Sequence, residues 1–243
     1  MKNLLIVFFL VIQVACSMKT YTADVRYESY RMDDNYGATH ASIDSIIFPY
    51  RDAIEREMNS VVGWAEKDMF KVKPNSPLNN WMADVLFDLA NEKSSFTVDF
   101  AIQNFGGIRI PQLAAGEVTR GKIFELMPFE NKLVILKSSG EIVKKLFDRI
   151  AQYGGWPLSQ GTSFTIIQDQ AVDIIINGKP FDIEKQYTFA LPDFIADGGD
   201  DCFFLADSER IDLELLIRDG ILLWLSEHNG IIPFNDEIRI FTE

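Results

Sequence analysis

The chain has 243 residues, of which 47% are hydrophobic and 24% charged, a composition typical of a globular protein with a core of its own. Its 36 acidic residues outnumber the 23 lysines and arginines, so the formal net charge is -13. Such a surface repels a phosphate backbone, which argues against a protein that binds long nucleic acid.

The first residues have the pattern of an export signal. A short basic start precedes an unbroken apolar run over residues 4–12, which is too short to span a bilayer and is typical of a signal-peptide core. Residues 13–16, Gln-Val-Ala-Cys, resemble a bacterial lipobox, although Gln13 stands where the usual pattern has Leu. We therefore expect a signal peptide over 1–15 and lipidation of Cys16. An ordinary signal peptide cut at about the same place is the alternative.

Both interpretations predict an exported protein, and lipidation would make it a bacterial membrane-anchored lipoprotein, in the periplasm or on the cell surface. Residues 16–41 are polar on average and lack a sustained period, so we expect a lipidated tether. The remaining cysteine, Cys202, then has no disulfide partner and is expected to be a buried small hydrophobe. The folded domain is predicted to cover residues 42–243.

From residue 42 onward the sequence becomes periodic. Apolar residues recur every three or four positions over about 42–60, which predicts an amphipathic helix that Pro49 kinks or restarts. A second helix is predicted over about 78–91. Residues 96–102 are predicted to form a strand, because apolar and polar residues alternate at its start.

The rest of the chain mixes strands and helices without regular βαβ spacing, which predicts an α+β fold. Asn177-Gly178 is a strong turn signal, so a hairpin whose far strand begins late is expected within 172–189. The remaining predicted elements, in chain order, are strand 132–137, helix 140–150, strands 163–167, 172–176 and 187–191, helix 213–227 and strand 237–241.

Three junctions beside apolar strands carry the candidate binding residues, because loops of glycine, proline and polar residues commonly build binding sites. The first is residues 104–109, Asn-Phe-Gly-Gly-Ile-Arg. Its glycine pair, Gly106 and Gly107, lets the backbone approach a ligand closely, and Arg109 offers a fork of donors that suits phosphate or carboxylate. A simple glycine turn with a surface arginine is the competing interpretation.

The other two junctions add aromatic and acidic residues. In residues 126–131, Leu-Met-Pro-Phe-Glu-Asn, the proline can fix Phe129 at a surface where a flat base could stack, unless that ring belongs to the core. In residues 191–200 an aromatic residue, a glycine pair and a carboxylate follow a strand, and they offer a stacking face and an acceptor for sugar hydroxyls. The aspartates of this stretch could instead cap turns.

The three junctions, in this order, resemble the C-terminal domain of the 5′-nucleotidase family, which includes bacterial UDP-sugar hydrolases and animal ecto-5′-nucleotidases. In that family an Asn-Gly-Gly-Gly-Ile-Arg loop, a Leu-Pro-Phe loop and a Phe-Leu-Ala-x-Gly-Gly-Asp loop converge on the substrate. Residues 137–140, 154–157 and 76–84 also resemble family segments, the last of them the Leu-Gly-Asn-Leu-x-x-Asp stretch on an early helix. The likeness runs from residue 42 to the C-terminus and implies an α+β fold with a layered mixed sheet and helices.

The resemblance implies a role for each matching residue. They are Phe129, Phe194 and Asn104 for the nucleobase and nucleoside, Asp200 for the ribose hydroxyls, Arg109 for the phosphate, and Gly106, Gly107, Gly198 and Gly199 for the supporting loops. These roles agree with the chemistry of the side chains, since two π faces suit an aromatic base, one carboxylate suits a diol and one guanidinium suits an anion.

Two departures from the family pattern bear on the substrate. Phe105 stands where the first family loop has a glycine, which crowds or redirects the site. Where the family often carries another phosphate-binding arginine, this chain reads Lys73-Pro74-Asn75, and Asn79 replaces the glycine of the Leu-Gly-Asn stretch. Fewer fixed cations predict a weaker hold on phosphate, and they leave the base and phosphate specificity open.

Hydrolysis in this family uses two metal ions held by a separate N-terminal domain rich in His, Asp and Asn. This chain has only two histidines, His40 and His228, and neither sits in a metal-binding motif. The acidic cluster of Asp197, Asp200 and Asp201 is more typical of a solvated turn. We therefore expect no cofactor, metal ligand or catalytic residue in this chain, and two divalent metal ions in a partner phosphoesterase.

Two functions fit these expectations. In the first, the chain is the nucleotide-binding half of a split 5′-nucleotidase and is inactive until it pairs with a separate dimetal phosphoesterase chain. In the second, it is a surface lipoprotein that binds a nucleotide or nucleoside without catalysis. A structural or adhesive surface protein is a third class, and it predicts that Phe129 and Phe194 are buried away from each other.

Overall fold

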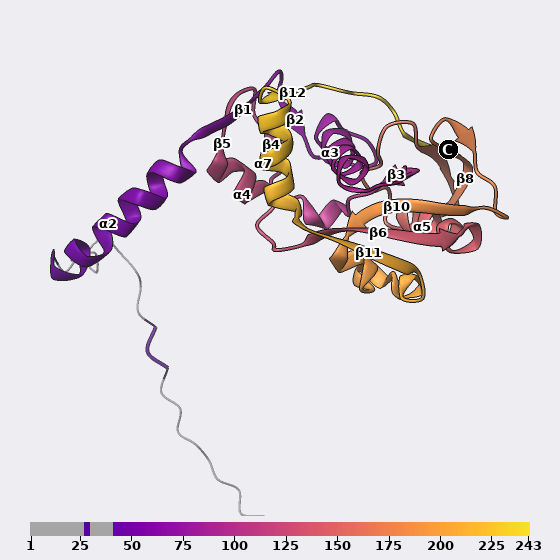
Figure 1. Ribbon diagram of the computed structural model, residues 1–243, viewed down its shortest axis with the longest axis horizontal. Coiled ribbons are helices and arrows are strands. Elements are labelled where there is room, and N and C mark those ends of the chain that lie inside the picture. Colours follow the sequence, from indigo (N-terminus) through magenta and orange to yellow (C-terminus); the bar gives the residue numbers. More distant parts are fainter. Residues whose placement is uncertain (1–26, 30–40) are drawn as a thin grey trace, which may run out of the picture. The chain divides into compact units, whose positions relative to one another are not determined.

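The computed structural model describes residues 27–29 and 41–243, which form parts of two compact units, residues 1–47 and 48–243 (Figure 1). The predicted signal peptide, Cys16, His40 and most of the predicted tether lie outside the described residues. Helix α2, Ala41–Met58, matches the first predicted helix and contains Pro49 within it. None of the helices in the described part combines the length and the apolar character needed to cross a bilayer.

The second unit contains the remaining helices and all the strands of the described residues. The helices are α3 Pro77–Lys93, α4 Arg120–Leu126, α5 Gly140–Gln152, α6 Asp193–Ala196 and α7 Ile217–Glu227, with short 3-10 turns η2 Phe105–Gly107, η3 Gly199–Asp201 and η4 Phe203–Leu205. The strands are β1 Val61–Ala65, β2 Met69–Phe70, β3 Phe100–Ala101, β4 Gln112–Leu113, β5 Gly116–Thr119, β6 Lys132–Ser139, β7 Ser163–Ile167, β8 Gln170–Ile176, β9 Lys179–Pro180, β10 Gln186–Pro192, β11 Glu209–Leu216, β12 Ile231–Ile232 and β13 Ile240–Thr242.

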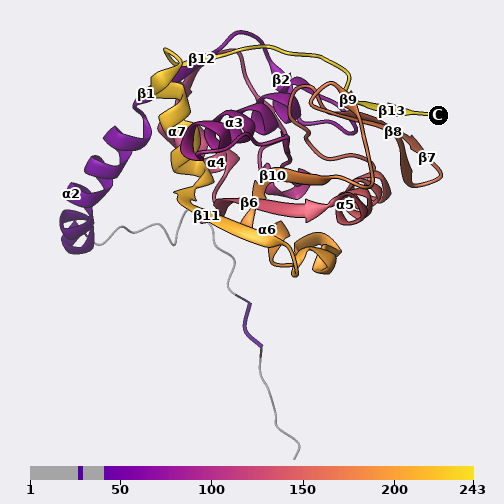
Figure 2. The ribbon, with the colours of Figure 1, turned by 45° about the vertical axis from the view of Figure 1, so that its right-hand side comes forward.

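A four-stranded sheet in the order β11-β6-β10-β3 lies between two hydrophobic cores. Along β6, Leu133 and Ile135 enter the core beneath α3 and α7, whereas Val134 and Leu136 enter the core against α5. Figure 2 shows α3 and α7 on one side of this sheet. Both faces of β6 are buried. Residues 133–136 are therefore all apolar and do not alternate between apolar and polar side chains.

Three smaller sheets complete the unit, with the orders β12-β1-β5, β13-β7-β8-β9 and β2-β4. The mixture of parallel and antiparallel pairs with interspersed helices confirms the predicted α+β class. The predicted helices at 78–91 and 140–150 and the predicted strands at 132–137, 163–167, 172–176 and 187–191 are also confirmed. The strand predicted over 96–102 is reduced to β3, because only its end pairs with β10.

Two predicted elements were wrong in extent. Residues 213–216 do not begin the last helix, because they continue β11, whose Leu215 and Leu216 pair with the start of β6 across a bulge. The helix starts at Ile217. The terminal strand also lies slightly later than predicted, at Ile240–Thr242, where it pairs in parallel with β7.

The hairpin was assigned to the wrong far strand. The Asn177-Gly178 turn does connect β8 to an antiparallel strand, but that strand is the two-residue β9. The strand β10 belongs to the central sheet, where it lies between β6 and β3. Because β10 pairs with β6 and β3 and not with β8, its carboxyl end forms part of the site described below.

Candidate functional site

Sheet topology brings the three junctions of the sequence together. Strands β3 and β10 are parallel neighbours, with Ala101 opposite Ala190, so the loops that follow them leave from one edge of the sheet. Strand β6 is antiparallel to β10, with Leu133 opposite Pro192, so the loop that precedes β6 lies at that same edge. The backbone N–H of Arg109 donates to the Leu126 carbonyl at 2.9 Å and joins the first junction to the second.

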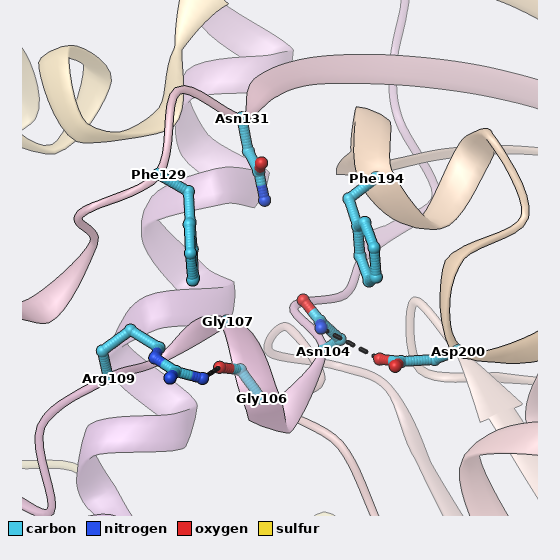
Figure 3. A pocket seen from close by; sticks show the side chains of 8 residues that line it. All are labelled: Asn104, Gly106, Gly107, Arg109, Phe129, Asn131, Phe194 and Asp200. Atoms are coloured by element: carbon cyan, nitrogen blue, oxygen red, sulfur yellow. Dashed lines mark hydrogen bonds between the residues drawn. The ribbon is translucent and has the colours of Figure 1, made fainter. Parts of the chain in front are cut away.

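The junctions surround a pocket of about 410 Å³ (Figure 3). It is lined by Asn104, Gly106, Gly107, Arg109, Phe129, Asn131, Phe194 and Asp200. The set includes both predicted aromatic residues, the predicted acid, the predicted guanidinium and the amide. The predicted Gly198 and Gly199 lie in the loop behind Phe194 and are not part of the lining.

Phe129 and Phe194 stand on opposite sides of the pocket, with the gap between their rings open (Figure 3). Phe129 is 42% exposed and Phe194 is 45% exposed, so neither ring is a core residue. This placement contradicts the expectation of the structural or adhesive class, in which the two rings are buried apart. Two half-exposed aromatic faces on facing walls are suited to hold a flat aromatic group.

Polar groups occupy the floor of the pocket. The Arg109 guanidinium lies 5.3 Å from the centroid of the Phe129 ring and donates to the Gly106 carbonyl at 3.2 Å. Asn104, which is buried, donates from Nδ2 to Oδ2 of Asp200 at 2.9 Å. The guanidinium and the carboxylate are therefore held at separate places beneath the two rings (Figure 3).

Residues 61–207 match the family described as 5′-nucleotidase, C-terminal domain, which is more than half of the chain. The chain belongs to this family. Protein UshA of Salmonella pullorum is 32% identical over 151 residues, which cover 60% of this chain and 26% of that protein. A 5′-nucleotidase of Vibrio vulnificus is 31% identical over 106 residues, which cover 42% of this chain and 19% of that protein.

Solved structures share the fold of the 5′-nucleotidase C-terminal domain. The 5′-nucleotidase precursor of Thermus thermophilus superposes with a TM-score of 0.68 at 24% identity, and the match covers 82% of this chain and 42% of that one. The NAD nucleotidase of Haemophilus influenzae gives a TM-score of 0.64 at 20% identity, with 84% and 42% covered. The chain thus spans less than half the length of these relatives.

Several glycines of the 5′-nucleotidase loops are required because neighbouring atoms lie too close to leave room for a Cβ. A Cβ on Gly107 would lie 2.1 Å from Nε2 of Gln103 and 2.7 Å from Oδ1 of Asn104. A Cβ on Gly199 would lie 2.5 Å from both a ring carbon and the carbonyl oxygen of Phe194, and Gly198 has a φ of +97° that favours glycine. Gly107, Gly198 and Gly199 therefore shape the walls that present Asn104 and Phe194, whereas a Cβ on Gly106 would meet no atom closer than 3.7 Å.

Phe105, which departs from the 5′-nucleotidase pattern, does not fill the pocket. Its ring is half-buried and points to the lysines that follow β2, with the Lys71 amine 4.2 Å and the Lys73 amine 4.9 Å from its centroid. Burial first, and then the charges of Arg109 and Lys73, lower the pKa of Lys71. Burial also lowers the pKa of Lys73, and the carboxylate of Asp200 opposes that shift.

Two residues that contribute to the site were not predicted from the sequence. Asn131 lies in the second junction, and its amide points into the gap between the two rings (Figure 3). Gln103 is fully buried and donates from Nε2 to Oδ1 of Asn104 at 2.9 Å, which orients the Asn104 amide. The position of Asn131 within a recognisable loop was the only signal available for either residue.

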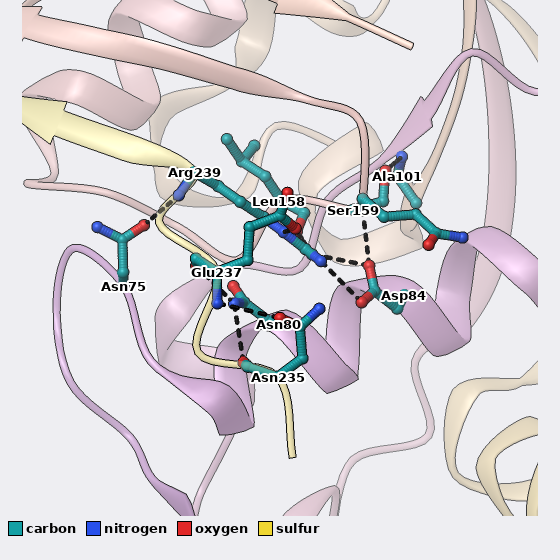
Figure 4. Close-up of polar contacts among 10 residues, drawn as sticks. Asn75, Asn80, Asp84, Ala101, Leu158, Ser159, Asn235, Glu237 and Arg239 are labelled. Atoms are coloured by element: carbon teal, nitrogen blue, oxygen red, sulfur yellow. Dashed lines mark hydrogen bonds and ion pairs between the residues drawn. The ribbon is translucent and has the colours of Figure 1, made fainter. Parts of the chain in front are cut away.

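A buried ion pair supports the strand from which the first junction leaves (Figure 4). Arg239, 2% exposed, binds both carboxylate oxygens of Asp84 at 2.7 and 2.9 Å and donates to the Leu158 carbonyl at 2.6 Å. The neighbouring Ser159 Oγ accepts from the backbone N–H of Ala101 at 2.9 Å. This network ties the C-terminal segment through residues 158–159 to β3.

Cys202 is buried beneath the Asp200 loop as a free thiol, which confirms its predicted role as a buried small side chain. Burial raises the pKa of the thiol to about 12, so it stays protonated near neutral pH. Within residues 27–29 and 41–243, no three His, Cys, Asp or Glu side chains converge as metal ligands would. His228 ends α7, where its ring stacks on Trp224.

Proposed function

We propose that this chain is the nucleotide-binding half of a 5′-nucleotidase and that a separate dimetal phosphoesterase chain supplies the hydrolysis. In this proposal a nucleobase lies between Phe129 and Phe194, and the Asn131 amide faces its edge. Asp200 receives the ribose hydroxyls and Arg109 receives the phosphate. The chain binds and orients the nucleotide, and the two divalent metal ions belong to the partner.

The observation that carries the proposal is the placement of two half-exposed phenyl rings on facing walls of one pocket. Base stacking on aromatic side chains contributes about 1–3 kcal/mol per base. The oxygen of Asp200 that does not accept from Asn104 is available to a hydroxyl, and the exposed Arg109 is available to an anion. These three chemistries match the three parts of a nucleotide.

The proposed cellular location rests on the sequence. The apolar run over 4–12 and the Gln-Val-Ala-Cys stretch before residue 17 support export and a lipid anchor at Cys16. A single acyl chain binds a membrane only weakly, so a stable anchor at Cys16 requires more than one chain. The site is therefore proposed to work outside the cytoplasm, at a bacterial membrane.

A nucleotide- or nucleoside-binding lipoprotein without catalysis is the second candidate, because the pocket alone accounts for binding. The two candidates differ in what happens when a partner is added. AMP hydrolysis is measured with Mn²⁺ or Zn²⁺, first with the full chain alone and then after mixing it with candidate dimetal phosphoesterases. Activity that arises only on mixing supports the split enzyme.

Binding is measured separately, by calorimetric titration of the full chain with a panel of nucleosides and nucleotides. Saturable binding without activity in any mixture supports the non-catalytic module. A chain that binds no member of the panel contradicts both candidates, because each depends on the pocket between Phe129 and Phe194.

A further inference from the structure

A second groove, of about 410 Å³, lies where the sheet β12-β1-β5 meets the end of α7, and we call it the β1 groove. Figure 1 shows the three strands beside α7. The groove is lined by residues 61–64 of β1, by Glu117 of β5, and by residues at the end of α7 and in the turn that follows. It shares no lining residue with the pocket proposed to bind the nucleotide.

Strand register places an indole ring beside a carboxylate on one face of this sheet. Trp64 of β1 is paired with Glu117 of β5 on one side and with Ile231 of β12 on the other. Side chains of directly paired residues leave a sheet on the same face. All three residues are exposed, Trp64 by 52%, so this face presents a flat aromatic surface with an acid next to it.

The turn after α7 is held firmly against β1. Asn229 and Gly230 adopt left-handed φ angles of 55° and 71°. The backbone N–H of Gly230 donates to the Leu225 carbonyl, and the Gly230 carbonyl accepts from the N–H of Trp64, each at 2.7 Å. A Cβ on Gly63 would lie only 2.9 Å from the Gly230 oxygen. The backbone of the groove is therefore fixed before any ligand binds.

The polar groups of the β1 groove are an acid and neutral donors and acceptors. Within the described part of the chain, neither the Glu117 carboxylate nor the Asn229 amide has a hydrogen-bond or ion-pair partner. Ser226 Oγ donates to the Leu223 carbonyl at 2.7 Å and can still accept a hydrogen bond. Since none of the described lining residues is a lysine or an arginine, the groove is not suited to a phosphate.

A sugar ring matches this set of groups. Its C–H groups can pack on the indole face of Trp64, and its hydroxyls can donate to a carboxylate and bond in both directions with an amide. A cationic amine would suit Trp64 and Glu117, but it would leave the neutral polar groups unused. An apolar side chain of a partner protein would cover Glu117 and Asn229 without pairing them, which costs free energy.

We propose that the β1 groove binds a neutral oligosaccharide, with one sugar ring on Trp64 and its hydroxyls bonded to Glu117 and Asn229. This site is separate from the nucleotide pocket and does not depend on the proposed function. Because the only charged lining residue is an acid and the net charge of the chain is -13, anionic sugars are disfavoured.

Trp64 itself reports the binding. The other three tryptophans, Trp81, Trp156 and Trp224, are at most 5% exposed, so acrylamide should quench mainly the fluorescence of Trp64. The full chain is titrated with cellotetraose, maltotetraose, mannotetraose and tetra-N-acetylchitotetraose. At least one of them should bind saturably and protect Trp64 from acrylamide. Calorimetric titration measures the same affinity without the fluorescence.

Two variants remove the groups that carry the proposal. By calorimetry, Trp64→Ala should weaken oligosaccharide binding about tenfold, as expected for one lost aromatic face. Glu117→Gln should weaken it about fivefold, because a charge-assisted hydrogen bond becomes a neutral one. Phe241→Ala is the matched control, since Phe241 is 49% exposed and lies outside the groove. All three variants should keep the affinity of the unaltered chain for AMP, and melting temperatures show whether each one is folded.

The proposal is overturned if none of the four oligosaccharides protects Trp64, or if binding is unchanged in folded Trp64→Ala and folded Glu117→Gln. Loss of activity in a mixture of Trp64→Ala with a dimetal phosphoesterase, in a chain that binds no oligosaccharide, would identify this face as a protein-docking surface instead. Failure of AMP to bind has a different meaning, because it contradicts the proposed function and leaves the result for the β1 groove standing.

Discussion

Asn104 donates a hydrogen bond from its side-chain Nδ2 to Oδ2 of Asp200 over 2.9 Å, although the two residues are 96 positions apart in the sequence. The bond joins the first junction to the third. The amide cannot turn over freely, because Gln103 donates to its Oδ1. Asp200 adopts a φ of 50°, a left-handed conformation uncommon for a residue with a side chain.

The first prediction concerns variants in which the donor and the acceptor of this hydrogen bond are exchanged. Asn104→Asp places two carboxylates in contact and should reduce the free energy of unfolding by about 1–3 kcal/mol, since a buried polar contact is lost. Adding Asp200→Asn to Asn104→Asp restores one donor and one acceptor with their roles reversed and should recover most of the stability. Urea unfolding of the single and double variants measures both effects.

Ligand binding separates the structural role of the pair from its proposed role toward ribose. Asp200→Asn should weaken binding of the ribonucleoside but not of its 2′,3′-dideoxy analogue, and the double variant should do the same despite its recovered stability. Equal losses of affinity for both ligands would show that Asp200 does not bind the ribose hydroxyls.

The second prediction concerns the two rings. Phe129→Ala and Phe194→Ala should each weaken nucleotide binding by about 1–3 kcal/mol, the contribution of one stacking face, and should leave the melting temperature nearly unchanged. Phe96→Ala is the control, because Phe96 is 39% exposed and lies outside the pocket lining. A large fall in melting temperature with unchanged binding would assign the two rings to the core instead.

Adjacent glycines supply the third prediction. Gly107→Ala should destabilise the chain by about 1–3 kcal/mol, because its new methyl group would overlap the side chains of Gln103 and Asn104. Gly106→Ala is the matched neighbour, since its nearest heavy atom would be 3.7 Å away. Thermal and urea unfolding of the pair should therefore differ. Equal stabilities would mean that the Gln103 side chain can adopt another conformation that avoids the new methyl group.

The fourth prediction follows from the pKa of Cys202. Because that pKa is raised to about 12 from the ordinary 9.0, the thiol's contribution to stability is fully present below pH 9 and is lost as the pH rises toward 12. At pH 8.5 the thiolate fraction in the folded chain should be about 1,000-fold lower than in the unfolded chain. Alkylation by iodoacetamide, followed by peptide mass spectrometry with and without urea, measures this difference. Comparable labelling of Cys202 in the folded chain would contradict its burial.

Elements with one dominant local pattern could be predicted from the sequence. Residues 133–136 form an apolar run of strand length, and helix α5 carries a single buried face that includes Val143, Leu146 and Ile150. Residues 213–216 were assigned to the wrong element because their leucines fit a helix as well as a strand. Pairing with β6, a contact with residues far away in the chain, decided between the two.

The same distinction holds within the site. Phe129, Phe194, Asp200 and Arg109 could be named because the order of three motifs resembles one family, and the structure brings them into one pocket. Gln103 could not be named, because the role of its amide depends on its orientation toward Asn104 and not on any spacing. The contacts of Phe105 with Lys71 and Lys73 could not be predicted from the sequence either, since each joins segments that meet only in the folded chain.

The last prediction tests whether the buried ion pair of Arg239 and Asp84 supports the pocket. Asp84→Asn removes the bidentate carboxylate partner of Arg239, leaves Glu237, 2.9 Å from Arg239 Nε, as its remaining counter-charge, and should reduce the free energy of unfolding by about 1–3 kcal/mol. Replacing both, with Asp84→Asn and Arg239→Met, also removes the buried guanidinium that lost its Asp84 partner, so the double variant should lose less than the sum of the single losses. Urea unfolding gives the coupling energy, and nucleotide titration of the folded double variant shows whether residues 158–159 still hold β3 and Asn104 in place. Additive losses would mean that Arg239 and Asp84 act independently, whereas coupled losses with unchanged binding would confine the pair to stability.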